Sequence, residues 1–151
     1  MIETLTFPTA LLGFLLLAAS AVVASRRDAP RFLLLATALV VVSHVGLVWT
    51  YRYSGDITRA TRNGYFGFLL FHCALALIVV SPMVPKGKLR RSLTFASFLT
   101  VCVGANGAIF RYDVVAPYRV PVIATTVVAI AWIALDWRRG LKRNREGQQA
   151  G

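Results

Sequence analysis

Acidic residues are scarce in this 151-residue chain, which has six aspartates and glutamates against seventeen lysines and arginines. No acidic or basic residue lies in the middle of a long apolar run. Ion-coupled pumps and transporters commonly carry such charges within the membrane, so the sequence argues against that class. Two cysteines are too few for a disulfide framework. No phosphate-binding loop, H-E-x-x-H motif or nucleophile elbow is present, so no catalytic class is indicated.

Long apolar runs are what the chain has in abundance. Hydrophobic residues make up 57% and charged residues 15%, whereas charged residues are about a quarter of a soluble domain. Each run has about 19–23 residues, enough to cross a ~30 Å hydrocarbon core as an α-helix, the conformation that lipid favours. The predicted spans are 7–25, 32–53, 63–85, 92–112 and 117–137.

The connections between these spans are short. We therefore expect an all-α polytopic membrane protein with one five-helix transmembrane domain over residues 1–140, in which consecutive helices are antiparallel neighbours. Residues 141–151 form a basic and polar tail on the cytoplasmic side, and we expect its stretch "RNREGQQAG" at 143–151 to be disordered.

The basic residues predict the orientation. Twelve of the seventeen follow spans one, three and five, and the other five flank the opposite ends. This alternation indicates an outside N-terminus and a cytoplasmic C-terminus. Span one is expected to be retained, because the N-terminal region carries Glu3 and no basic residue, unlike a signal peptide. The charge of +11 thus reflects topology, not nucleic-acid binding. The basic tail has the composition for contact with anionic lipid.

Polar residues gather at one depth in the outer half of the predicted bundle. His44 lies nine residues before Tyr53 and His72 nine residues after Asn63, so both are ~13 Å from the outer boundary. Cys73 and Cys102 lie at nearly the same depth, whereas the inner halves read as almost purely aliphatic. Small residues allow close helix approach, so we expect the tightest packing in the outer half. The outer-half glycines are Gly46, Gly64, Gly67, Gly104 and Gly107.

This polar layer has three interpretations. In the first, the histidines and hydroxyl groups only form hydrogen bonds between helices. In the second, His44 and His72 ligate one b-type haem through neutral imidazole nitrogens. Arginines at the outer ends would then pair with the propionates, and aromatic side chains would line the ring. The arginines are Arg52, Arg59, Arg62, Arg111 and Arg119, and the aromatics are Trp49, Tyr65, Phe68 and Phe71.

The third interpretation is a copper or zinc site formed by His44, His72 and a cysteine. It is the weakest, because His72 and Cys73 are adjacent and point about 100° apart on a helix. A Cys73–Cys102 disulfide is compatible with their depths. The loop "YRYSGDITRATRNGY" is a further candidate site at the outer surface, for haem propionates, a quinone head group, lipid phosphate or a partner subunit. Its simpler interpretation is an interfacial loop with paired charges.

The stretch "GYFGFLLFHCALALIVVSPM" has an aromatic entry, then H-x-x-L-A, then a proline at its predicted cytoplasmic end. In these features spans two to four resemble a family of small bacterial inner-membrane proteins of uncertain function, some linked to assembly of haem-copper terminal oxidases. His72 is the position that carries over. The layout also resembles, more loosely, small bis-histidine cytochrome b subunits, which would employ His44 and His72 together.

We therefore expect an accessory or redox subunit of a membrane electron-transfer complex, with His44 and His72 as haem and metal ligands and Arg52, Arg59 and Arg62 beside the cofactor. The alternative is a non-catalytic structural or assembly subunit whose histidines are only hydrogen-bonded. In both cases the partners are the lipid bilayer and other membrane subunits.

Overall fold

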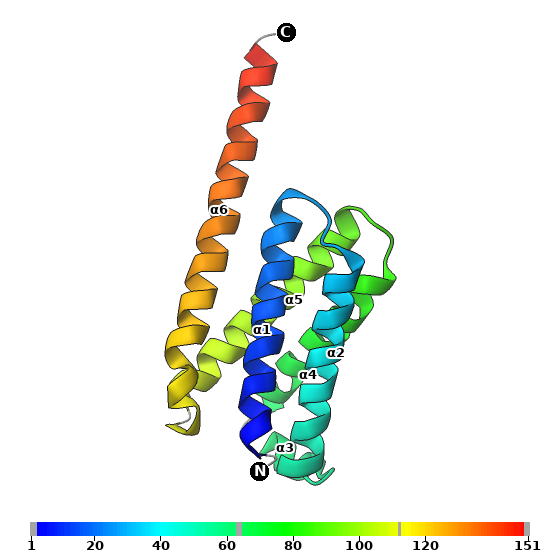
Figure 1. Ribbon diagram of the computed structural model, residues 1–151, viewed down its shortest axis with the longest axis vertical. Helices are drawn as coiled ribbons and strands as arrows, with labels where there is room; N and C mark the ends of the chain where they lie inside the picture. Colours follow the sequence, from blue (N-terminus) through cyan, green and yellow to red (C-terminus); the bar gives the residue numbers. More distant parts are fainter. Residues whose placement is uncertain (1–2, 63–64, 112, 150–151) are drawn as a thin grey trace.

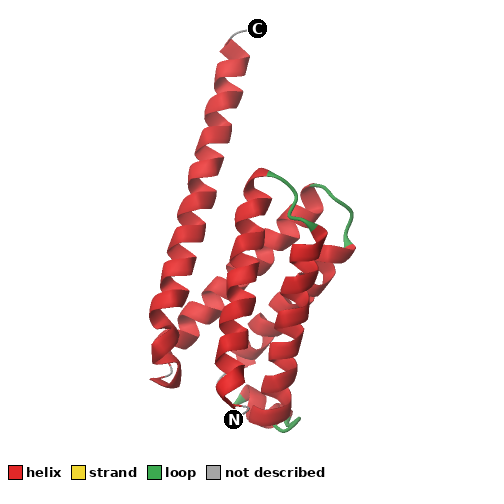
Figure 2. Cartoon of the chain, viewed as in Figure 1, coloured by secondary structure: helices red, strands yellow, loops and turns green. Residues whose placement is uncertain are grey.

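The computed structural model describes residues 3–62, 65–111 and 113–149, and every regular element within these ranges is helical (Figures 1 and 2). The α-helices are α1 (Glu3–Arg26), α2 (Arg31–Leu47), α3 (Ile57–Thr61), α4 (Tyr65–Val80), α5 (Lys88–Arg111) and α6 (Arg119–Gln149). A π-helix, η1 (Val48–Arg52), continues α2, and two 3-10 helices, η2 (Ser81–Met83) and η3 (Asp113–Tyr118), lie between the longer elements.

Five helical segments in the described ranges are long and apolar enough to cross a membrane. They are Leu5–Arg26, Arg31–Arg52, Tyr65–Met83, Lys88–Phe110 and Ala116–Leu141. Each coincides with one predicted span, so the expectation of an all-helical, multi-pass membrane protein is confirmed.

Prolines and glycines mark the turns between these segments. Pro30 caps α2 with an extended backbone, φ −56° and ψ 138°. Pro82 follows the end of α4 and lies within the 3-10 turn η2, as expected because a proline disfavours α-helix in the residue before it. Gly87, at φ 146°, adopts a backbone open to glycine alone and precedes α5. The segment after η1 reverses at Ser54 and Gly55, both with positive φ.

Helix α1 is the centre of the arrangement. It packs against α2, α5 and α6, whereas α4 packs mainly against α5 and also contacts α2. Figure 1 shows α1 between α2 and α6, with α5 crossing behind it. We call the end with turns 27–30 and 84–87 the basic end, and the opposite end, where residues 53–62 lie, the α3 end.

Many of the buried side chains lie in the half of the bundle toward the basic end, where the sequence had not led us to expect the closest packing. Helix α1 turns small residues toward its neighbours there, and Ala21 and Ala24 are fully buried. Phe98 of α5, also fully buried, stacks on Phe14 with ring centroids 6.3 Å apart. The reason is the run "AASAVVAS" at 18–25, whose small side chains let neighbouring helices approach closely.

Two local expectations are also corrected. The tail from 141 is not disordered in its backbone, because α6 continues as a helix to Gln149 and extends beyond the other helices (Figure 1). The polar loop 54–62 contains the short helix α3, which Asp56 caps. Asp, Asn, Ser and Thr are the preferred residues at that position, because their side-chain oxygens accept from the first free backbone N–H groups.

Candidate functional site

His72 lies near the middle of α4 and uses both of its ring nitrogens within the chain. Its Nδ1 is 2.7 Å from the carbonyl oxygen of Phe68, one turn earlier, and its Nε2 is 3.2 Å from Nε1 of Trp49 on η1. An indole N–H can only donate, so Nε2 is the acceptor. Nδ1 therefore carries the proton and donates to the carbonyl oxygen of Phe68. His72 is thus a neutral imidazole with one hydrogen bond at each ring nitrogen.

Aromatic rings surround this imidazole. The ring of Phe68 lies 4.1 Å from that of His72, and the ring of Trp49 lies 5.9 Å from it, edge to face. Trp49 also contacts Tyr53 and Phe68, and Tyr65 stacks on Phe68. We call these five residues the histidine–aromatic cluster. Three of its aromatics were expected to line a haem, but here they pack on one another and on His72.

His44 forms its hydrogen bond with a different helix. Its Nδ1 is 3.2 Å from Oγ1 of Thr9 on α1. The Thr9 hydroxyl also lies 2.8 Å from the carbonyl oxygen of Leu5 and 2.9 Å from that of Thr6. Because one of these carbonyls takes the single hydroxyl proton, Thr9 accepts from His44 Nδ1–H. His44 thus joins α2 to α1, whereas His72 joins α4 to the end of α2.

The two histidines fit a haem unequally. An axial imidazole usually donates its Nδ1–H to an oxygen and offers Nε2 to the metal, and both residues have the required Nδ1 bond. The Nε2 of His72, however, accepts from Trp49, which would have to move before His72 could ligate iron. Phe71, the fourth expected aromatic, packs instead against Gly104.

The cysteines take no part in a cluster with the histidines. Cys73 is exposed and Cys102 is buried, and both are free thiols. Within the described ranges, no three His, Cys, Asp or Glu side chains come close enough to hold one metal ion.

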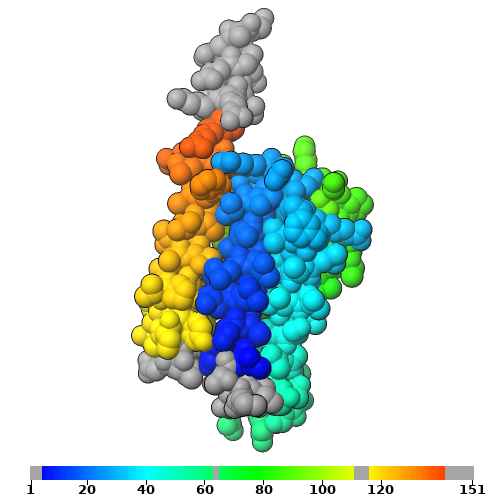
Figure 3. All heavy atoms as spheres, viewed as in Figure 1, coloured from blue at the N-terminus to red at the C-terminus, as the bar shows by residue number. Residues whose placement is uncertain are grey.

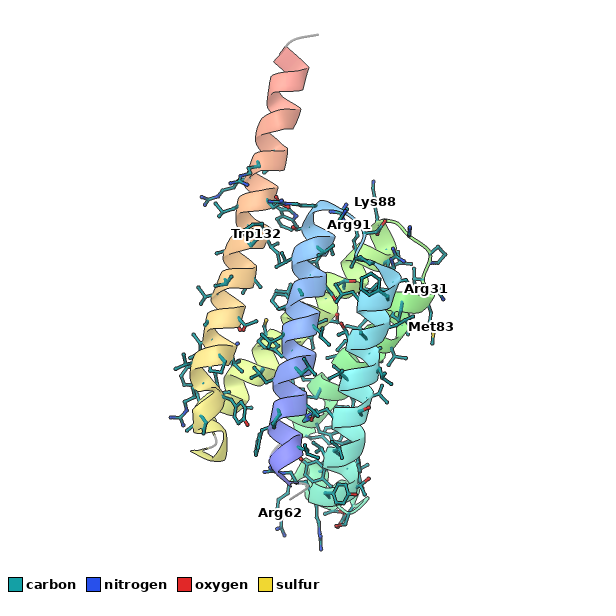
Figure 4. The ribbon with its side chains drawn as sticks, viewed as in Figure 1. Arg31, Arg62, Met83, Lys88, Arg91 and Trp132 are labelled. Carbon is teal, nitrogen blue, oxygen red and sulfur yellow. The ribbon has the colours of Figure 1, made fainter. Side chains whose placement is uncertain are left out.

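The arginines proposed for the propionates lie at the α3 end. Arg59 pairs with Asp56 at 3.5 Å in an exposed contact, and Arg52 and Arg62 are exposed. Figure 4 shows Arg62 pointing away from the helices. Arg119 donates from Nε to the carbonyl oxygen of Ile109 at 2.8 Å. The side chain of Arg111 lies outside the described part of the chain.

Asp56 organises this loop. Its Oδ1 accepts from the backbone N–H of Thr58 at 2.8 Å and from that of Arg59 at 3.4 Å. The Thr58 amide is the main cause that holds the pKa of Asp56 below its ordinary value, with smaller contributions from the Arg59 amide and guanidinium. The loop thus agrees with the simpler interpretation of an interfacial segment with paired charges.

The glycines expected to bring helices together divide into two groups. A Cβ on Gly104 would lie 2.8 Å from Cζ of Phe71, so α4 and α5 do meet closely there. A Cβ on Gly46, Gly67 or Gly107 would meet nothing within 4 Å. Gly64 lies outside the described residues. Three of the five glycines, all near the α3 end, are therefore not covered by any neighbouring group of the described residues.

Sequence reasoning missed the polar contacts of the basic end. Arg91 donates from Nε and Nη2 to the carbonyl oxygens of Ala24 and Ser25, at 2.7 and 2.9 Å. It lies beside the end of α1 in Figure 4. These are among the last carbonyls of α1, and a cation there also favours the helix dipole. Arg91 therefore acts as a cap in addition to any topological role.

Asp136 of α6 binds the same end of α1. It accepts from Nε of Arg26 and from the hydroxyl of Ser25, each at 2.8 Å. Asp28, in the following turn, accepts from the backbone N–H of Gly87 at 3.2 Å. Arg90 is buried, and the nearest carboxylate oxygen, on Asp28, is 3.9 Å from its Nε. The sequence signal for these contacts was two acidic residues, Asp28 and Asp136, that lie close to basic residues in a strongly basic chain.

Buried hydroxyl groups also lie toward the basic end, in the part of the spans that was expected to be aliphatic. Ser20 of α1 lies 3.3 Å from Thr37 of α2, and Ser81 of η2 lies 3.0 Å from Thr94 of α5, measured between hydroxyl oxygens. The hydroxyl group of each threonine also donates to a carbonyl oxygen one turn earlier in its helix. The polar layer is thus not confined to one depth.

Comparisons with protein-family models, with curated protein sequences and with solved structures find no significant match to this chain. The resemblance to terminal-oxidase assembly proteins and to bis-histidine cytochrome b subunits therefore stays an expectation from the residues around His72 and His44.

Proposed function

We propose that this chain is a non-catalytic subunit of a larger assembly in a bacterial inner membrane, with its N-terminus outside and its C-terminus in the cytoplasm. The orientation follows from the basic residues, which are concentrated in turns 27–30 and 84–87 and at the end of α6. Short connections and the pairing of α1 with α2 and of α4 with α5 support an antiparallel bundle.

The observation that carries the proposal is the open backbone of Gly46, Gly67 and Gly107. These residues lie on α2, α4 and α5, all within about two turns of the α3 end. Helix interfaces in membranes are enriched in glycine, because the absence of a side chain lets two backbones approach. Among the described residues no neighbour covers these three glycines, so a partner helix at the α3 end would complete the packing.

The histidines support the same proposal. Both imidazoles have hydrogen-bond partners within the chain, Thr9 for His44 and Trp49 with Phe68 for His72. Interhelical hydrogen bonds of this kind contribute typically ~0.6 kcal/mol each. They hold α1, α2 and α4 together at the α3 end, where the partner would bind.

A second candidate keeps the redox role. In it His44 and His72 ligate one b-type haem, with Arg52, Arg59 and Arg62 near its propionates. Its support is the Nδ1 bond of each imidazole to an oxygen atom, which leaves Nε2 as the ligating nitrogen. The open glycines would give room for the macrocycle. The candidate requires Trp49 to release His72.

The test is purification of the tagged protein from its native membranes in mild detergent, followed by native electrophoresis and a reduced-minus-oxidised spectrum. We expect a stoichiometric complex without a Soret band. Gly107→Leu should dissociate the complex, whereas Ala96→Leu, which introduces the same side chain at an exposed site of the same helix, should leave it intact.

His44→Ala and His72→Ala separate the two candidates. A Soret band that both variants abolish would establish the haem and refute the non-catalytic role. A monomeric, colourless wild-type protein would refute both candidates. Equal dissociation by the Gly107 and Ala96 variants would show that the surface around Gly107 is not the interface.

A further inference from the structure

The seam between α1 and α6 contains two adjoining hollows of different polarity. Toward the middle of the bundle lies an open, apolar groove of about 390 Å³. Its walls are mostly small side chains, among them Ala18 and Ala19 of α1 and Ala124 and Ala129 of α6. Figure 3 shows the yellow-to-orange part of α6 beside the blue α1 along this seam.

At the basic end the same seam opens into a polar pocket of about 400 Å³. It is lined by Ser25, Arg26, Asp136, Arg139 and Gly140. On α1 the two hollows are separated by a single turn, from Val22 to Ser25. They therefore follow one another along the same side of α1.

The charges in the polar pocket are unequal. Asp136 is neutralised within the chain, because Arg26 and Ser25 each bond one of its oxygens at 2.8 Å. The Arg26 guanidinium also lies 5.0 Å from the ring of Trp132, which Figure 4 labels on α6. Arg139 also lines the pocket and interacts electrostatically with Asp136, one turn earlier on α6, but it forms no ion pair within 4 Å with any carboxylate of the described residues. The pocket thus has a net positive charge, and Arg139 is the side chain that can bind an anion there.

We propose that one anionic phospholipid binds in the α1–α6 seam, with its phosphate at Arg139 and an acyl chain in the apolar groove. The lengths agree with this assignment. From Leu15 in the groove to Arg26 in the pocket, α1 rises about 16 Å, which is half of a ~30 Å hydrocarbon core and so the depth of one leaflet.

The charge complementarity favours a lipid over a partner helix. A transmembrane helix would fill the apolar groove equally well, but its apolar side chains would leave the excess positive charge of the pocket, two arginines against one aspartate, without an anion. A phosphodiester supplies the missing anion, and basic pockets between helices at the membrane surface bind such head groups. The indole of Trp132, between groove and pocket, suits the level at which acyl chains meet head groups.

The experiment is native mass spectrometry of the full chain, purified from nanodiscs that contain equal amounts of phosphatidylglycerol and phosphatidylcholine. We expect one phosphatidylglycerol molecule to stay bound and phosphatidylcholine to be lost. Arg139→Gln should lower the retained fraction about fivefold, the factor that ~1 kcal/mol for one basic residue near anionic lipid amounts to. Arg138→Gln, which removes the same charge outside the pocket, should change it little.

The groove is tested separately. Ala124→Phe fills it without a change of charge and should abolish retention, whereas Ala131→Phe, exposed on the same helix but outside the groove, should not. Equal retention of the two lipids, equal effects of Arg139→Gln and Arg138→Gln, or a lipid-free dimer that Ala124→Phe dissociates would each overturn the proposal. The comparison of the two lipids on the wild-type chain needs no variant. It therefore tests the proposal even where a variant fails to fold.

Discussion

Gly104 is the position at which a single methyl group tests the packing of α4 on α5. In the structure a Cβ at residue 104 would lie 2.8 Å from Cζ of Phe71 and 3.0 and 3.2 Å from the two Cε atoms. Gly107, one turn further along α5, is a matched control, because a Cβ there meets nothing within 4 Å. Gly104→Ala and Gly107→Ala thus make the same chemical change on the same helix.

The magnitude follows from the geometry. The tip of the Phe71 ring must retreat by about 0.6 Å to lengthen 2.8 Å to the 3.4 Å of ordinary contact. Overpacking typically costs ~1–3 kcal/mol, and Phe71 is 43% exposed and has room to move, so we expect the lower part of this range. Alanine in place of helical glycine gains ~0.5–1 kcal/mol at both positions. The difference between the two variants removes that gain and should be ~1–2 kcal/mol.

The assay is reversible unfolding in mixed micelles, in which SDS is raised and helicity is followed by circular dichroism. Gly107→Ala should unfold at higher SDS than Gly104→Ala. Phe71→Leu should recover most of the loss when combined with Gly104→Ala, because it removes the ring atoms that clash, and a double-mutant cycle measures this coupling. Equal stability of the two alanine variants, or no coupling to Phe71, would refute the packing described for α4 and α5.

Three further changes address the polar contacts. Arg91→Met should cost ~1.5–3 kcal/mol in the same SDS titration, because charge-assisted hydrogen bonds to the end of α1 are lost. Asp56→Ala should remove the cap of α3, a loss of ~1 kcal/mol seen as faster hydrogen exchange at Thr58, whereas Asp56→Asn should retain the cap. Since the folded pKa of Asp56 is lowered, its contribution is present above the unfolded value of ~3.9. It is lost as pH falls through the folded pKa, so the protection of the Thr58 amide, measured relative to its intrinsic exchange rate at each pH, should decrease only in acid. Trp49→Phe should shift the ¹⁵N resonance of His72 Nε2, which loses its donor, and leave that of Nδ1 nearly unchanged.

The spans could be predicted from the sequence because lipid imposes a simple requirement. Each helix needs about twenty apolar residues, and Pro30 and Pro82 mark the ends of the first and third runs on the side where the chain turns. Which face of each helix packs could not be predicted in the same way. Helices α1 and α4 are apolar on all sides, so their sequences contain no contrast between a buried and a lipid-facing stripe. The small residues of 18–25 were the available signal for the buried face of α1 toward the basic end.

For the candidate site, the depth of each histidine follows from counting residues, but its partner depends on the rotation of the helix and on neighbouring side chains. Thr9 was not a candidate, although it binds His44. Trp49 was expected as lining, yet its N–H is the donor that occupies His72. Arg91 read as a topological charge, since only the fold brings it to the end of α1.

The two ends of the bundle differ in their polar contacts and in how well their helices are covered. This difference affects where a partner is expected to bind. At the basic end, polar side chains from α5 and α6 converge on the last turn of α1, and buried hydroxyl pairs lie just beneath. At the α3 end, the histidine–aromatic cluster joins α4 to η1, but three helices keep open glycine faces. A partner at the basic end would have to displace charge-assisted bonds, whereas one at the α3 end would displace only lipid. We therefore expect assembly at the α3 end, with the lipid in the α1–α6 seam left undisturbed when the complex forms.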